Sequence, residues 1–292
     1  MNNVDPLKLL FIINPRSGNN NTNWKSNIEQ SLQSSGHVSE WLLLPEHIDQ
    51  EAIRQKIAIF QPDRVVAVGG DGTIKLVAEC LLFTSTCLGI IPTGSANGLA
   101  KELNIHGDLE RALDIIVNGS VKTIHVTNIN DQICIHLGDI GFNAFVIKKF
   151  ETEAHRGFWG YVKAAWKVLW QQPLMQITMI IDNEVIKTHA AMVVIANATK
   201  YGSGACINPE GKLDDELFEV VVVKKVSFPE IFKMMVTHSP FDEEKTEVFQ
   251  MKFLEIYTKK KAHFQVDGEY LGKVNVVKAK LIPGALKIIV PG

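Results

Sequence analysis

The spacing of apolar residues in the first 120 positions alternates between two periods. Short continuous apolar runs, which are typical of buried strands, are each followed by a segment with apolar residues at helical spacing. This alternation predicts a parallel, doubly wound α/β sheet. The expected strands are residues 8–13, 38–44, 65–68 and 87–91. The expected helices are residues 23–32, 48–60, 99–103 and 109–118, with another beginning near residue 74.

From residue 121 onward the pattern changes to strand-like stretches separated by short turns, which predicts a mostly antiparallel, β-sandwich-like domain. We place the first domain at residues 1–126 and the second at 127–281. The last segment, 282–292, contains a strand-like run at 285–290 that is free to return to the first domain. The expected strands of the second domain are residues 175–181, 185–196, 218–223, 247–257, 262–266 and 274–281.

One helix is expected within the second domain, at residues 157–170 (GFWGYVKAAWKVLW). Its apolar face and its Trp and Lys residues suit a helix at a membrane surface. The same face suits ordinary packing against a sheet or between domains, and we favour that interpretation.

Three of the expected parallel strands end in loops that suit phosphate: NPRSG (14–18), GGDGT (69–73) and PTGSANG (92–98). Because the carboxyl ends of parallel strands share one edge of a sheet, we expect the loops to converge. A glycine loop before a helix presents backbone N–H groups and the positive end of the helix dipole to an anion. Asp71 suits a divalent cation that bridges phosphate oxygens. Taken singly, each loop is also explained as a turn, with Asp71 as a helix cap and Arg16 solvated.

Two acidic segments occur in the second domain. The first, KLDDELF (212–218), places three carboxylates together, which is costly unless they are solvated or bind a metal. The second, VDGE (266–269), also fits a plain hairpin with Asp-Gly at its tip.

Composition narrows the class of protein. The 292 residues carry a formal net charge of -2, so no overall basic field points to nucleic acid. The four cysteines have no metal-ligand spacing, and buried reduced thiols explain them. No apolar run reaches the length of a membrane span. We therefore expect a cytoplasmic protein, a location compatible with peripheral, transient contact with a membrane surface. A homodimer is one of the oligomeric states that the sequence leaves open.

The motifs NPRSG, GGDGT, PTGSANGLA, PEGKLDDEL and VDGE, in that order, resemble the diacylglycerol kinase catalytic family, which includes bacterial soluble lipid kinases and sphingosine kinases. The resemblance implies a nucleotide-binding α/β domain and a β-sandwich-like domain with ATP in the cleft between them. It implies a Mg²⁺-dependent transfer of the ATP γ-phosphate to a lipid hydroxyl, most simply of diacylglycerol.

The resemblance also assigns roles to residues. Asp71 would act through catalytic Mg²⁺, and Asp267 would be the general base, although the sequence does not settle which of the two takes the proton. Asp214 and Asp215 would belong to a structural Mg²⁺ site. The residues implied at the nucleotide or its phosphates are Asn14, Arg16, Ser17, Gly70, Gly72, Thr73, Thr93, Gly94, Ser95 and Glu269.

Two departures from the family pattern keep alternatives open. Glu216 stands where many relatives have glycine, which puts the metal geometry in question. Gly98 replaces an acidic residue, so that Ser95 with Asn97 is closer to the GSxN form of sphingosine kinases. A sphingoid base or another hydroxylated lipid is therefore an alternative acceptor. An NAD kinase-like enzyme, which shares GGDGT, and a non-catalytic nucleotide or lipid sensor are weaker alternatives.

Overall fold

The structure is a computed structural model that describes residues 6–18, 22–33, 35–45, 50–152, 163, 166–168, 174–181, 184–199, 206–209, 211–227, 229, 233 and 242–292. The chain separates into two compact units. Unit 1 comprises Met1–Ile124 with Gly284–Gly292, and unit 2 comprises His125–Pro283.

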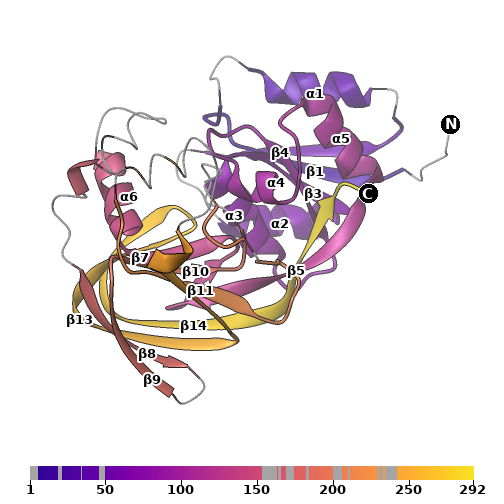
Figure 1. Ribbon diagram of the computed structural model, residues 1–292. Coiled ribbons are helices and arrows are strands. Elements are labelled where there is room, and N and C mark those ends of the chain that lie inside the picture. Colours follow the sequence, from indigo (N-terminus) through magenta and orange to yellow (C-terminus); the bar gives the residue numbers. More distant parts are fainter. Residues whose placement is uncertain are drawn as a thin grey trace. The chain divides into compact units, whose positions relative to one another are not determined.

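Unit 1 contains a parallel sheet in the order β2-β1-β3-β4. Its helices cover both faces: α1 and α5 lie on one side, and α2 and α3 on the other (Figure 1). The fold class expected from the sequence is therefore confirmed for this unit. The strands are β1 (Lys8–Ile13), β2 (Val38–Leu43), β3 (Arg64–Gly69) and β4 (Cys87–Pro92), and the helices are α1 (Trp24–Leu32), α2 (Gln50–Phe60), α3 (Asp71–Leu81), α4 (Gly98–Glu102) and α5 (Leu109–Asn118).

The apolar runs of the central strands form the core of unit 1. Phe11 of β1 and Val66 of β3 are fully buried and pack in one cluster with Ile28 of α1 and Ile116 of α5. Burial on both faces explains why these strands are continuous apolar runs rather than alternating ones. This common core holds the ends of the strands in fixed register.

Unit 2 is built from antiparallel strand pairs in the order β12-β11-β10-β7-β13, with β8 beside β13, β9 beside β8 and a further antiparallel pair of β5 with β6. Its elements are β5 (Ser120–Ile129), β6 (Gln132–Cys134), β7 (Leu137–Gly141), α6 (Phe142–Thr152), β8 (Met175–Ile181), β9 (Glu184–Ala190), β10 (Met192–Ala196), β11 (Phe218–Val223), the 3₁₀ turn η1 (Glu243–Lys245), β12 (Thr246–Met251), β13 (Phe253–Val266) and β14 (Glu269–Val290). Strands β5 and β14 each contain residues of both units.

The central strands of unit 2 are covered on both faces. Val194 and Val221 face a cluster that includes Phe142 and Val146 of α6. Val193 and Val220 face a second cluster with residues of β8, β13 and β14. This two-core arrangement agrees with the expected β-sandwich-like class.

Some expected boundaries are wrong. The expected strand 185–196 is two strands, because the chain leaves its partner β8 at Ala190 and joins β7 and β11 from Met192. The expected strand 247–257 is interrupted at Lys252, and its second part continues through 262–266 as β13. The runs 274–281 and 285–290 form one strand, β14.

Two helices in unit 2 bear on the sequence predictions. Helix α6 (Phe142–Thr152) was not expected. The expected helix 157–170 lies outside the described residues apart from 163 and 166–168, which are helical. In the part of the chain that the structure describes, no helix is both long and apolar enough to cross a bilayer.

Candidate functional site

Three neighbouring strands of unit 1 end at the same edge of the sheet. Strand β3 lies between β1 and β4, and all three are parallel. The backbone N–H of Asn14, just after β1, donates to the carbonyl of Val68 at 3.0 Å. The N–H of Thr93, just after β4, donates to the carbonyl of Gly69 at 2.9 Å. The loops after β1, β3 and β4 therefore begin side by side, at the edge where open α/β sheets bind ligands.

Side-chain hydrogen bonds tie these three loops together. The Asn14 Nδ2 donates to Thr73 Oγ1 at 3.1 Å, which joins the first loop to the start of α3. The Thr93 Oγ1 lies 3.0 Å from Ser17 Oγ, which joins the first loop to the third. The structure therefore brings together four of the residues that the sequence proposes for phosphate or nucleotide.

Glycine is required where two of the loops meet. A Cβ on Gly94 would lie 2.5 Å from Gly70 Cα and 2.8 Å from Asn97 Oδ1. Gly18 has a φ of +77°, and a Cβ there would lie 2.6 Å from the carbonyl oxygen of Thr93. Backbone packs directly on backbone here, so that a side chain at either position would push the loops apart.

Helix α3 starts at this edge without a side-chain cap. Gly70 is the N-cap residue and makes no side-chain hydrogen bond, and its carbonyl accepts from Thr73 and Ile74. The amides of Asp71 and Gly72 occupy the first turn, where an α-helix has no internal acceptor for them. A Cβ on Gly72 would meet nothing within 4 Å. The sequence thus places an uncapped helix N-terminus beside open space, the arrangement that favours a phosphate.

Asn97 gives the third loop its shape. Its φ is +52°, its Oδ1 accepts from the Gly94 N–H at 2.9 Å, and its Nδ2 donates to the Gly94 carbonyl at 2.7 Å. Both ends of the amide are thus used to close the turn that presents the exposed Ser95. The sequence motif contains Asn97, but its positioning role is visible only in the structure.

In the structure Arg16 makes hydrogen bonds within the protein, whereas the sequence suggests that its side chain clamps a phosphate. Its guanidinium Nη2 donates to the carbonyl of Pro45 at 3.2 Å, and its backbone N–H donates to Asn14 Oδ1 at 3.1 Å. The side chain is exposed. Arg16 thus connects the first loop to the segment that follows β2.

Asp267 lies in unit 2, at the tip of the hairpin between β13 and β14. Asp267 and Gly268 have φ values of +50° and +85°, which is the backbone of a two-residue hairpin turn. The Asp267 carboxylate accepts backbone N–H groups from Ile135 at 3.0 Å, His136 at 2.9 Å and Leu137 at 3.2 Å. The Cys134 Sγ lies 3.5 Å from the same carboxylate. Asp267 therefore holds the turn between β6 and β7, whatever else it does.

The other acidic candidates of unit 2 remain near the surface. Glu269 and Asp214 are exposed, and Asp215 Oδ1 accepts from the backbone N–H of Leu217 at 3.4 Å. Glu216 pairs with Lys252 at 2.5 Å, and this hydrogen bond lowers the pKa of the Glu216 carboxyl below its ordinary value. Within the described ranges, no three His, Cys, Asp or Glu side chains are grouped closely enough to hold a metal ion.

Two buried carboxyl groups of unit 2 were not singled out from the sequence. Asp139 on β7 is 1 % exposed and accepts from Asn143 Nδ2 at 2.6 Å, from the Ala144 N–H at 2.8 Å and from Gln265 Nε2. These bonds join the start of α6 to strands β7 and β13. The sequence signal that could have revealed Asp139 is the GDIGFNA stretch, in which a carboxyl group stands inside an apolar run.

The second buried carboxyl group is Glu219 on β11, which has no exposed surface. It accepts from Asn208 Nδ2 at 2.8 Å and from Gln250 Nε2 at 3.1 Å. Burial raises the pKa of Glu219, in opposition to these hydrogen bonds, which lower it. The group links three segments and is not placed to contact a ligand.

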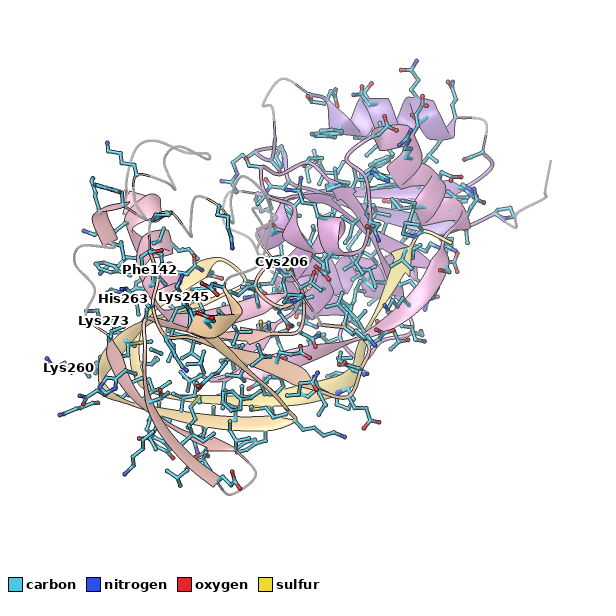
Figure 2. The ribbon with its side chains drawn as sticks, in the orientation of Figure 1. Phe142, Cys206, Lys245, Lys260, His263 and Lys273 are labelled. Atoms are coloured by element: carbon cyan, nitrogen blue, oxygen red, sulfur yellow. The ribbon has the colours of Figure 1, made fainter. Side chains whose placement is uncertain are left out.

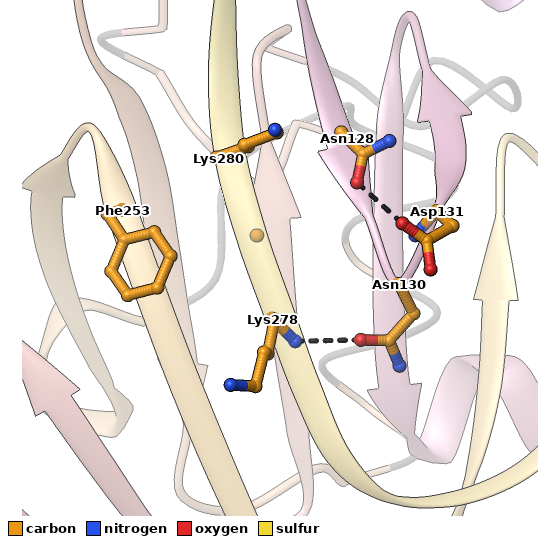
Figure 3. A pocket seen from close by; sticks show the side chains of 7 residues that line it. Asn128, Asn130, Asp131, Phe253, Lys278 and Lys280 are labelled. Carbon is orange, nitrogen blue, oxygen red and sulfur yellow. Dashed lines mark hydrogen bonds between the residues drawn. The ribbon is translucent and has the colours of Figure 1, made fainter.

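A shallow pocket of about 310 Å³ in unit 2 is lined by polar side chains that make hydrogen bonds within the fold. In Figure 3, the Asn130 side chain reaches the backbone of Lys278, and the Asn128 side chain reaches Asp131. These bonds fix the turn between β5 and β6 against β14. This pocket is therefore explained by the fold.

Family models match both parts of the chain. Residues 8–129 match the diacylglycerol kinase catalytic domain. Residues 139–290, which are more than half of the chain, match the YegS C-terminal NAD kinase β-sandwich-like domain.

Two curated relatives are similar in sequence. A diacylglycerol kinase from Staphylococcus saprophyticus is 26% identical over 221 residues, which cover 73% of this chain and 72% of the relative. An uncharacterised protein from Synechocystis is 28% identical over 240 residues, which cover 78% of this chain. Those residues span only 54% of the Synechocystis protein's own length.

Solved structures share the fold. The crystal structure of a diacylglycerol kinase from Bacillus anthracis aligns with a TM-score of 0.73 at 21% identity and covers 97% of this chain and 96% of that one. An NAD kinase from Archaeoglobus fulgidus, in complex with ATP, aligns with a TM-score of 0.57 at 14% identity and covers 96% of this chain and 93% of that one. At these identities the structures establish the fold, and the family models extend it to a common family. The chain therefore belongs to the diacylglycerol kinase catalytic family, whose members are kinases with an alcohol group as acceptor.

Proposed function

We propose that this protein is a Mg²⁺-dependent kinase that transfers the γ-phosphate of ATP to the hydroxyl group of a lipid, most simply a diacylglycerol. The observation that carries the proposal is the joining of three loops around the uncapped N-terminus of α3 in unit 1. Phosphoryl transfer needs positioned amide donors and charge neutralisation more than covalent chemistry, and these loops supply the donors.

The residues present suit Mg²⁺ that arrives with ATP. Mg²⁺ in phosphate sites is commonly held by one or two carboxylates, with nucleotide phosphates and water completing its shell. Asp71, the first residue of α3, is the carboxylate in the right place for this. Bound there, the ion would neutralise charge on the phosphates. Asp214 and Asp215 do not form a ligand group with other described residues, and no step is assigned to a metal at that position.

The reaction assigns separate tasks to this chain's residues. The amides of Asp71 and Gly72 and the loop containing Gly94 bind the phosphates in unit 1. A base takes the proton of the lipid hydroxyl as its oxygen forms a bond to the γ-phosphorus and the bond from that phosphorus to ADP breaks. We propose Asp267 for this base, in line with the family motif. Its oxygens would then serve both the acceptor and the turn at residues 134–137.

Two other acceptors follow from specific observations. The GSAN loop, closed by Asn97, has the form found in sphingosine kinases, and this favours a sphingoid base as the second candidate. The structural similarity to an NAD kinase makes NAD a third candidate. For either lipid acceptor we propose a cytoplasmic protein that contacts a membrane peripherally, because the acceptor lies in the bilayer.

The proposal is tested by following radiolabel from [γ-³²P]ATP with Mg²⁺ into diacylglycerol or sphingosine in mixed micelles, and into NAD in solution. We expect label in diacylglycerol. Asp71→Asn should lower kcat by about 100-fold or more, because it removes the carboxylate from the phosphate site. Its matched control is Asp63→Asn, which removes the same charge at the other end of β3, where Asp63 accepts the Lys8 N–H at 2.7 Å. That control should keep its activity.

Each result has a distinct meaning. Label only in sphingosine or only in NAD would replace diacylglycerol with that acceptor. Equal activity in Asp71→Asn and Asp63→Asn would refute the proposed phosphate site. ATP binding without label in any of the three acceptors would refute a kinase that acts on diacylglycerol, sphingosine or NAD.

A further inference from the structure

Three consecutive lysines of unit 2 occupy a bulge in β13. The register pairs Tyr257 with Val276 and then Ala262 with Val274, so five steps along β13 match two steps along β14. Residues 259–261, all lysine, are the extra ones. A bulge takes residues out of the regular ladder and turns their side chains away from it. All three lysines are exposed.

The same segment lies where β13 changes its neighbour. Up to Thr258 the strand pairs with β8, and from Phe264 it pairs with β7. The chain therefore turns a corner between two parts of the sheet at the lysines. Thr258 Oγ1 lies 3.4 Å from the carbonyl of Val274 and 3.3 Å from that of Asn275, which fixes the beginning of the bulge.

The lysines border a pocket of about 580 Å³ in unit 2. Lys273 of β14 joins them at its rim, and Phe145, Leu174 and Met175 supply apolar surface. Figure 2 shows Lys260, His263 and Lys273 along the same edge of the unit, with Lys260 extending away from the ribbon. Leu174 is 53 % exposed, so part of the apolar surface is open to the outside.

Aromatic side chains form one wall of the pocket, and two more lysines lie over aromatic rings there. The His263 ring stacks on Phe145 with centroids 4.2 Å apart, and its Nδ1 lies 2.8 Å from the hydroxyl oxygen of Tyr270. Lys148 Nζ lies 5.5 Å from the Tyr270 ring centroid, and Lys149 Nζ lies 5.6 Å from that of Phe145. Burial lowers the pKa of His263 to about 4, with smaller contributions from Lys273, Lys148 and Lys149. The histidine is thus neutral near pH 7, and the positive charge is that of the lysines.

Among the residues that the structure describes, the four rim lysines, Lys259, Lys260, Lys261 and Lys273, have no ion pair with a carboxylate. By contrast, Lys224 pairs with Glu247 at 2.6 Å, Lys245 with Asp242 at 2.9 Å and Lys278 with Glu255 at 2.6 Å. In a chain of formal net charge -2, this is a local concentration of uncompensated cations. Its complement is an anion, and the adjoining apolar surface calls for a ligand with a hydrocarbon part.

We propose that this pocket binds an anionic phospholipid at a bilayer surface, with the phosphate of the headgroup among Lys259, Lys260, Lys261 and Lys273. The first part of an acyl chain would lie against Phe145, Leu174 and Met175. Lysine ammonium groups are effective point charges for phosphate, and each lysine near an anionic leaflet adds measurably to membrane binding. The inference involves no catalytic step, and it stands or falls separately from the proposed kinase activity.

The test is co-sedimentation of the full chain with phosphatidylcholine vesicles that either contain or lack phosphatidylglycerol. We expect binding to the anionic vesicles that weakens as salt is raised. The variant K259Q/K260Q/K261Q should bind about two orders of magnitude more weakly, at roughly 1 kcal/mol for each lysine. The control K224Q/K245Q/K278Q also lowers the formal charge from -2 to -5, but it removes lysines that are already paired. It should bind within about threefold of the unsubstituted protein.

Further arms separate the lipid from other anions. Leu174→Ser should weaken vesicle binding without changing the melting temperature, because this side chain is largely exposed. Calorimetric titration with inorganic phosphate should show no binding at concentrations where vesicles bind. Equal losses in the two triple variants would reduce the effect to net charge and overturn the proposal. Saturable binding of phosphate alone, or tighter binding to a single-stranded oligonucleotide than to anionic vesicles, would overturn it in favour of those ligands.

Discussion

The substitution Asp267→Asn tests the central polar contact of unit 2. In the structure one carboxylate oxygen accepts from the amides of His136 and Leu137, and the other accepts from the amide of Ile135. Asparagine keeps the size of the side chain and tolerates the left-handed backbone, with φ of +50°, at this position. However, one of its two ends is an NH₂ group, which faces a backbone N–H instead of accepting from it.

The cost follows from counting these bonds. The best arrangement turns the amide oxygen of the new side chain toward His136 and Leu137 and leaves the N–H of Ile135 without an acceptor. A buried donor that loses its acceptor costs about 1–3 kcal/mol. The two remaining bonds lose the help of the charge, which roughly halves their strength. We expect a total of about 2–4 kcal/mol, which corresponds to a melting temperature lower by about 5–15 °C.

The measurement is thermal unfolding followed by circular dichroism, with Asp131→Asn as the matched control. Asp131 is also at positive φ, +63°, in the two-residue turn between β5 and β6, and it is exposed. Both substitutions remove one negative charge and keep a residue that accepts this backbone. The control should change the free energy of unfolding by no more than about 0.5 kcal/mol.

Equal melting temperatures for the two variants would refute the reasoning, because Asp267 would then contribute nothing to holding residues 135–137. Kinase assays below the lower melting temperature add the second half of the test. If Asp267 is also the general base, kcat should fall by about 100-fold or more while the variant is folded. A variant that is destabilised but fully active would leave Asp267 only its structural role.

Three further predictions concern the glycine loops and the buried titratable groups. Gly94→Ala should lower both stability and ATP affinity, because its Cβ would lie 2.5 Å from Gly70 Cα. Gly72→Ala should keep its melting temperature, because nothing lies within 4 Å of its Cβ. Differential scanning fluorimetry with and without ATP measures the stability and the ATP affinity of each variant. The folded-state pKa of His263, about 4, lies below its unfolded value near 6.5. The contribution of His263 to the free energy of unfolding is therefore present above pH 6.5 and lost as the pH falls toward 4. In urea unfolding, His263→Gln should lack this acid-induced loss of stability. The pKa of Glu219 is raised, so stability should fall as pH rises from about 4.5 through the folded-state pKa, and Glu219→Gln should lack that slope.

The sequence was a good guide to unit 1 because its rules are local. The apolar runs of β1, β3 and β4 are strands buried on both faces, and the residues Pro15, Gly70 and Pro92 mark where these strands stop. The convergence of the loops followed from parallel topology alone. The bond between Asn14 and Thr73 and that between Ser17 and Thr93 then agree with this expectation.

The errors in unit 2 arise from changes of partner, which local patterns do not encode. The apolar run across Ala191 has no turn signal, yet β9 and β10 on either side of it pair with different strands. The partners of the Asp267 carboxylate lie 130 to 133 residues earlier in the chain, so no motif could have revealed them. The bond from Arg16 to Pro45 was hidden in the same way, because it depends on the packing of two loops.

The composition of unit 1 has a practical consequence for dividing this protein into fragments. Its first 124 residues are completed by Gly284–Gly292, where Ile288 pairs with Leu88 on the edge of β4 and both side chains are fully buried. A fragment that stops after Ile124 would expose the edge of β4 as an unpaired, apolar template for aggregation. Joining the sequence of residues 284–292 to such a fragment through a flexible linker should restore solubility. A fragment corresponding to unit 1 must therefore combine two stretches that are far apart in the sequence.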